Sequence, residues 1–222
     1  MMSNLFSTFD PATSNLLSMN WLSTFISLII MPLPYWMLPN RFNLMINMMI
    51  NSLHKEFKLL MNNMESMTIT SLTLFMFILI NNMMGLMPYI FTSSSHLTFT
   101  MTMALPLWIS FMMFGWINHT KHMFAHLVPM GTPMMLMPFM VLIETISNLI
   151  RPGSLAVRLT ANMIAGHMLM SLLGNNSISS NSISLMVIMI IQVVLMLFET
   201  AVALIQAYVF SMLTTLYASE VM

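Results

Sequence analysis

The chain has 222 residues, of which 58% are hydrophobic and only 5% are charged, whereas a soluble domain carries about a quarter charged residues; we therefore expect a protein that resides in a membrane. The formal net charge is zero and no basic cluster is dense enough to bind a polyanion, which argues against nucleic acid as a partner. Cysteine is absent, which excludes disulfide bonds, thiolate metal sites and cysteine nucleophiles.

The first apolar segment, residues 16–38, is predicted to be a transmembrane helix. The sequence before it lacks the basic region and the cleavage pattern of a signal peptide, so we expect the segment to be retained. Pro32 and Pro34 are expected to bend or end the helix near its exit. Arg41 follows directly, where an interfacial anchor is expected.

The next segment, residues 43–66, is predicted to be an amphipathic helix that lies in the membrane surface. Its apolar residues recur at helical spacing, which gives the helix one apolar face. The other positions hold ionisable side chains, namely His54, Lys55, Glu56, Lys58 and Glu65.

Two further transmembrane helices are predicted over residues 68–90 and 97–117. Between Glu65 and Lys121 there is no Lys, Arg, Asp or Glu. This uncharged interval is long enough for two crossings of about 20 residues each.

A polar connection follows at residues 118–133 and contains Lys121 with three histidines. His119, His122 and His126 have a spacing that could align metal ligands, but no carboxylate or cysteine accompanies them. We therefore interpret them as loop residues and expect neither a metal nor a cofactor.

Two longer apolar stretches, residues 134–173 and 183–216, are predicted to form an antiparallel hairpin of strongly tilted helices, joined by a polar loop at 174–182. A continuous helix over the second stretch would be about 50 Å long, against a hydrocarbon core of about 30 Å. It must therefore tilt more than the usual ~20°. The "RPG" at residues 151–153 predicts a break or kink in the first helix. The whole chain, 1–222, is thus predicted to be one all-α polytopic membrane domain.

The basic residues outside the predicted spans indicate the orientation. The first span is followed by Arg41, Lys55 and Lys58, and the third span is followed by Lys121. Because two spans separate the two groups of basic residues, both groups lie on the same side of the membrane. By the positive-inside rule this is the cytoplasmic or matrix side, and the 174–182 loop faces the opposite compartment.

The predicted hairpin also concentrates polar side chains inside the membrane, where ionisable residues are costly and indicate function. Arg158 keeps its proton and can act only as a fixed positive charge. Glu144, His167 and Glu199 can each exchange protons near neutral pH in a suitable environment. They are placed toward opposite sides of the membrane, Glu144 toward the basic loops and the other two toward the far side, with Arg158 between them.

Two amides share helix faces with these charged groups. Asn162 lies one turn after Arg158, and Gln206 lies seven residues after Glu199. The pattern indicates two polar entries from opposite sides of the membrane, separated by an arginine.

Alternative readings remain open at this point. Arg158 and Glu199 could form a buried ion pair that joins the two helices, as in a structural or transporter-type membrane subunit. Arg151, beside Pro152, could be an arginine that extends to the interface. Haem ligation would need histidines paired inside the membrane, and only His167 lies well inside a predicted span.

Several segments closely resemble subunit a of the F-type ATP synthase in its mitochondrial form: "NNMMGLMPY", "MALPLW", "AHLVPMGTP", "VLIETISNLIRPGSLAVRLTANMIAGH" and "ETAVALIQAYVFSMLTTLY". The resemblance extends from about Ser71 onward and is weak over the first 60 residues. The "RLTANMIAGH" segment, followed by a glutamate and a glutamine seven residues apart, is its most specific part.

The resemblance implies a proton-translocating subunit of the mitochondrial inner membrane, packed against a ring of c subunits and assembled with peripheral-stalk and other membrane subunits. It would not be an enzyme by itself, since the ATP chemistry belongs to partner subunits. Arg158 would be the essential arginine that faces the carboxylate of each c subunit, with Asn162 and Gln206 beside it. The resemblance also implies a proton path. His167 and Glu199 would line the half-channel from the intermembrane space, and Glu144 would lie in the half-channel to the matrix.

Overall fold

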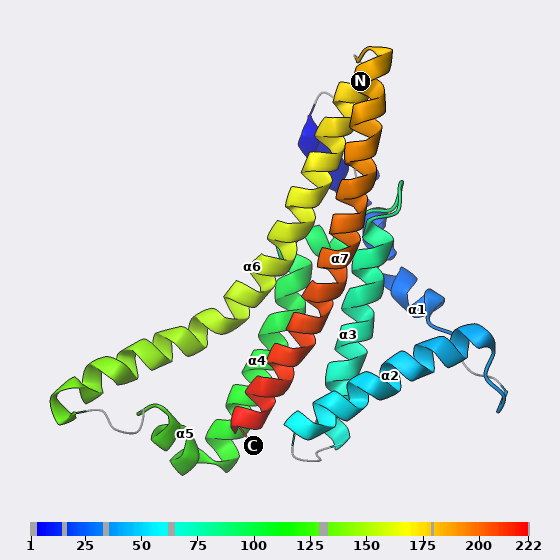
Figure 1. Ribbon diagram of the computed structural model, residues 1–222. Coiled ribbons are helices and arrows are strands. Elements are labelled where there is room, and N and C mark those ends of the chain that lie inside the picture. Colours follow the sequence, from blue (N-terminus) through cyan, green and yellow to red (C-terminus); the bar gives the residue numbers. More distant parts are fainter. Residues whose placement is uncertain are drawn as a thin grey trace.

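A computed structural model describes residues 4–14, 17–32, 36–61, 65–128, 133–178 and 180–221, which fold mainly into helices (Figure 1). Among these described residues, four helices are long and apolar enough to cross a membrane. They are α3 (Glu65–Gly85), α4 (Leu97–Asn118), α6 (Met137–Ile178) and α7 (Ser182–Val221). The predicted all-α polytopic fold is confirmed.

The first apolar segment forms a shorter helix than the predicted range 16–38. A 3-10 helix, η2 (Met19–Phe25), continues into α1 (Ile26–Ile30). The helix ends there because the residue before a proline is driven out of helical geometry, and Met31, before Pro32, has a ψ of 118°. A run of about 20 residues is needed to span the hydrocarbon core, and Met19–Ile30 falls short of it. Residues 15–16 and 33–35 of the wider region lie outside the described residues.

The predicted surface helix corresponds to α2 (Arg41–Leu60), which ends before the predicted residue 66. Its last part packs against α3 and α7, and the Phe57 side chain is fully buried there. Its first part leaves apolar side chains such as Phe42 and Met45 exposed, as a helix in contact with lipid requires. Figure 1 shows α2 and the short helix α5 (Thr120–His126) at the same end of the bundle.

The spans α3 and α4 hold the hairpin in place, because α3 packs mainly on α7 and α4 mainly on α6. Small buried side chains such as Ala156 and Ala207 let the helices approach closely within the core. Gly85, at the end of α3, has a similar role: a Cβ there would lie 3.0 Å from Cγ2 of Thr92 and 3.6 Å from Cε of Met163. The glycine in "NNMMG" therefore permits a close contact between α3, the following loop and α6.

The long helices α6 and α7 form the predicted antiparallel hairpin, and both extend beyond the predicted ends at 173 and 216. With 42 and 40 residues, each is about 60 Å long, so neither fits a membrane without a large tilt. The "RPG" sequence does not break α6, which is continuous through Pro152. Instead α6 bends, since its green first part leaves the bundle at an angle to its yellow second part (Figure 1).

Candidate functional site

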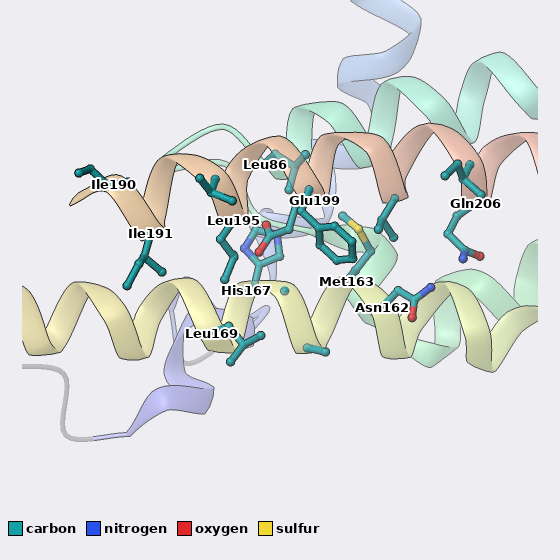
Figure 2. Close-up of a pocket in the computed structure, with 16 residues that line it drawn as sticks. Leu86, Asn162, Met163, His167, Leu169, Ile190, Ile191, Leu195, Glu199 and Gln206 are labelled. Carbon is teal, nitrogen blue, oxygen red and sulfur yellow. The ribbon is translucent and has the colours of Figure 1, made fainter. Parts of the chain in front are cut away.

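A cavity of about 780 Å³ lies between α6 and α7 and brings together four of the six predicted site residues. Asn162 and His167 line it from α6, and Glu199 and Gln206 line it from α7. Figure 2 shows His167 and Glu199 pointing toward one another, with Asn162 and Gln206 further along the hairpin. The remaining lining is mostly apolar, so the polar groups are concentrated at these positions.

The two ionisable groups in the cavity have buried polar atoms that lack partners. Glu199 is only 8% exposed. Within the described part of the chain, neither its Oε1 nor Nε2 of His167 has a hydrogen-bond partner. Leaving a buried polar atom unpaired costs about 1–3 kcal/mol. A water in a roomy cavity can bond such buried polar atoms, so the two groups are placed where they could exchange protons with each other and with water.

Gly166 makes room for the Glu199 side chain, a role that sequence reasoning missed. A Cβ at Gly166 would lie 2.8 Å from Cδ and 2.9 Å from Oε1 of Glu199, which is closer than real Cβ contacts. The carboxyl group therefore packs directly on the backbone of α6. The glycine next to His167 is visible in the sequence, but the residue it faces on another helix is not.

Arg158 lies outside the cavity, on the exposed face of α6. Its neighbours Ala156 and Leu159 are buried in the helix packing, so the arginine is presented outward. Among the described residues, no ion pair or hydrogen bond is found for its guanidinium group. The alternative of an Arg158–Glu199 ion pair is not formed, since Glu199 packs into the cavity instead.

Glu144, the sixth predicted residue, lies outside the cavity in an ion-pair network centred on Arg151. Arg151 Nη2 is 3.6 Å from Oε1 of Glu144, and its Nη1 donates a 2.8 Å hydrogen bond to Oε2 of Glu220. The guanidinium also lies 5.2 Å from the centre of the Tyr217 ring. Arg151 therefore connects α6 to the end of α7 and does not simply extend into solvent.

The three histidines predicted to lie in a loop are the remaining candidate for metal binding, but His122 and His126 lie in the helix α5 and His119 directly precedes it. The rings of His122 and His126 have centroids 6.4 Å apart. In the described ranges, no group of three or more histidine, cysteine, aspartate or glutamate side chains is arranged to hold a metal ion.

Comparison with known proteins identifies the family. The family model "ATP synthase A chain" matches residues 16–219. The chain belongs to this family. It is 61% identical to ATP synthase subunit a of Aedes aegypti over 225 residues and 59% identical to that of Drosophila melanogaster over 223 residues, with 100% of each chain covered. It is also 60% identical to ATP synthase subunit a of Anopheles gambiae, again with full coverage of both chains.

The resemblance to the mitochondrial F-type subunit a is confirmed, and the match reaches further toward the N-terminus than the quoted segments. As a member of the ATP synthase A chain family, the protein is a membrane-sector subunit of the F-type ATP synthase, and its partners lie within that complex. It is a multi-pass protein of the inner membrane. It takes part in proton transport and ATP synthesis. It is not the catalytic subunit of that complex.

Proposed function

We propose that this chain is the stator subunit that translocates protons, offering two offset half-channels to the carboxylates of a ring of c subunits. Proton flow through them drives ring rotation and thus ATP synthesis in partner subunits. The observation that carries the proposal is the α6–α7 cavity, in which His167 and Glu199 face each other with unpaired polar atoms. Arg158 lies outward on the same hairpin, where a partner can reach it.

Arg158 sets the charge state of the passing carboxylate. Opposite charges 4 Å apart attract by about 4 kcal/mol at an effective dielectric constant of 20. A ring carboxylate that reaches Arg158 is therefore favoured in its ionised form and loses its proton. Because a guanidinium does not release a proton, Arg158 also prevents direct proton passage between the two half-channels.

The cavity residues supply one half-channel, toward the intermembrane space. His167 and Glu199 exchange protons across the gap between α6 and α7, and Asn162 and Gln206 line the cavity with them as polar supports. Both amides can donate and accept hydrogen bonds without changing charge. They can therefore orient water between the ionisable pair and the ring.

Glu144 belongs to the other half-channel, toward the matrix. It lies on α6 before the bend, in contact with Arg151. A ring carboxylate on one side of Arg158 thus exchanges its proton near the cavity, and on the other side it exchanges near Glu144. A potential of 100 mV does about 2.3 kcal/mol of work per charge moved, which biases the direction of rotation.

The same proposal places the chain in the mitochondrial inner membrane, with α2 and the 118–133 loop toward the matrix and the 174–182 connection toward the intermembrane space. The positive-inside rule favours this orientation. The position of α2 and α5 at one end of the bundle, opposite the α6–α7 turn, supports it (Figure 1). Peripheral-stalk and other membrane subunits complete the set of partners.

Replacement of Arg158 tests the proposal. We expect Arg158→Ala, in the assembled complex in membrane vesicles, to abolish ATP-driven proton pumping while ATP hydrolysis continues. Arg158→Lys should also pump poorly, because lysine lacks the planar fork and can deprotonate when buried. Normal pumping by Arg158→Ala would contradict the proposal and favour a structural role for the hairpin charges.

A further inference from the structure

The N-terminal segment, residues 4–14, lies against the cavity-forming part of α6. Its 3-10 helix η1 (Leu5–Phe9) contacts α6. The Phe9 ring meets the His167 ring edge to face, with centroids 6.3 Å apart and an angle of 87° between the ring planes. In Figure 2 this segment, in pale violet, runs beside α6 near His167 and Leu169.

We propose that Phe9 is a positioning residue that packs on the His167 imidazole and holds it toward Glu199. This inference rests on the proposed role of His167 and Glu199 in proton transfer. It extends that role to the N-terminal segment. This segment does not line the cavity, and it lies outside the quoted sequence segments that resemble subunit a.

The segment is held in place by contacts that do not involve His167. The Asn20 side-chain amide donates a 3.1 Å hydrogen bond to the Asp10 carbonyl, which ties the residue after Phe9 to η2. The backbone N–H of Ala12 donates a 3.0 Å bond to Oδ1 of Asp10, and the Thr13 hydroxyl donates a 2.9 Å bond to the Leu17 carbonyl. Phe9 is therefore carried by a folded loop.

That loop is in turn fixed to the start of α4 by an aromatic cluster. Trp21 of η2 packs against His96 and Phe91, with ring centroids 5.3 and 5.9 Å away. Phe91 and His96 stack on each other at 5.2 Å. A continuous set of contacts thus runs from the α4 end of the bundle through η2 and the Asp10 loop to Phe9 and His167.

An aromatic hydrocarbon ring suits this position for a chemical reason. Phenylalanine has no strong donor or acceptor, so it covers the imidazole without offering the proton another route. The edge-to-face contact also favours one orientation of the His167 ring. Proton exchange at His167 is then confined to Glu199 and to water in the cavity.

Substitution at Phe9 tests the inference, with Phe6 of the same helix as the matched control because its side chain is 69% exposed. In assembled complexes in vesicles, Phe9→Ala should lower passive proton conduction several-fold per complex, and Phe6→Ala should leave it unchanged. Phe9→Leu, which keeps an apolar cover over the imidazole without a donor or acceptor, should restore part of the conduction. Modification of His167 by diethyl pyrocarbonate, followed by peptide mass spectrometry, should be faster in Phe9→Ala than in Phe6→Ala.

A double-mutant comparison separates this inference from the proposed function. If Phe9 acts through His167, adding Phe9→Ala to His167→Gln should lower conduction no further. Loss of conduction in His167→Gln, together with wild-type conduction and modification rates in Phe9→Ala, would overturn the inference and leave the proposed function standing. Normal conduction in His167→Gln would instead contradict the proposed role of His167 itself.

Discussion

The two ends of the α6–α7 hairpin treat their ionisable groups in opposite ways. At the cavity, the Glu199 and His167 side chains are largely enclosed and keep polar atoms without partners. At the other end, Glu144 and Glu220 both contact Arg151, and all three side chains are partly exposed. The same pair of helices therefore holds a buried pair of ionisable groups with unpartnered polar atoms and a partly exposed ion-pair network.

This difference suggests different tasks for the two ends. Partly exposed ion pairs contribute only about 0–1 kcal/mol, so the Arg151 network is an inexpensive way to hold two helix ends together. An unpaired buried polar atom costs about 1–3 kcal/mol. Its retention at Glu199 is easier to explain by proton exchange than by stability. In the proposed function Glu144 takes part in both tasks, because a proton that binds its carboxylate weakens the ion pair with Arg151.

The same substitution at two glutamates of α7 should separate the ends most strongly. We expect Glu199→Gln to reduce passive proton conduction by about a hundredfold, the scale on which a lost proton-transfer group acts. Glu220→Gln removes only one partner of Arg151 and should change conduction far less. Conduction would be measured as proton uptake by vesicles after the catalytic sector is removed. Equal losses in both variants would break the distinction between the ends.

The contact between Gly166 and Glu199 should be the next most sensitive feature. A methyl group at Gly166 displaces the carboxyl group, and we expect Gly166→Ala to slow proton-driven ATP synthesis roughly threefold to tenfold, as a barrier increase of about 1 kcal/mol would. The control is Gly174→Ala in the same helix, where a Cβ would have nothing within 4 Å. Unchanged synthesis in both variants would show that the position of Glu199 tolerates a shift.

At the other end, Glu144→Gln should have a smaller and different effect. The amide keeps the shape of the side chain but cannot exchange protons, so ATP-driven pumping should slow and its pH dependence should change. The measurement is the pumping rate over a series of matrix-side pH values. A pH profile that matches the unsubstituted complex would remove Glu144 from the proton path and leave it a structural partner of Arg151.

Arg151→Ala should have the smallest effect, since the ion pairs that it breaks are partly exposed. We expect a loss of about 1 kcal/mol or less in the stability of the hairpin ends, seen as faster limited proteolysis near the C-terminus in detergent. Arg151→Lys should recover part of the protection. If Arg151→Ala stopped proton conduction as completely as Glu199→Gln, the network would belong to the proton path.

The sequence was sufficient for the fold class, the family and the helices around the site. Charge-free runs of the right length predicted α3 and α4, and the lengths of the last two apolar stretches predicted the tilted hairpin. His167 and Glu199, which the sequence analysis expects toward the same side of the membrane, line one cavity. These features depend on composition and spacing along single helices, which sequence records directly.

Features that depend on contacts between helices were missed. The "RPG" sequence predicts a kink in α6, but the contact between Arg151 and Glu220 needs the position of the end of α7 relative to α6, which local spacing does not give. The packing of Glu199 on Gly166 and of Phe9 on His167 needs the relative positions of separate elements. The first apolar helix is shorter than the predicted range 16–38, because it begins at Met19 and ends at Ile30, before the prolines that were expected to bend or end it.

The central claim is that Arg158 faces the carboxylate of a neighbouring ring subunit, and cysteine cross-linking in the cysteine-free chain tests it most directly. Ala161 lies one turn from Arg158 and is exposed, whereas Ala156 on the same helix is fully buried. In the assembled complex, Ala161→Cys should form an oxidant-induced cross-link to a cysteine placed beside the carboxylate of a c subunit, and Ala156→Cys should not. Cross-linking from neither position, or equally from both, would contradict the account.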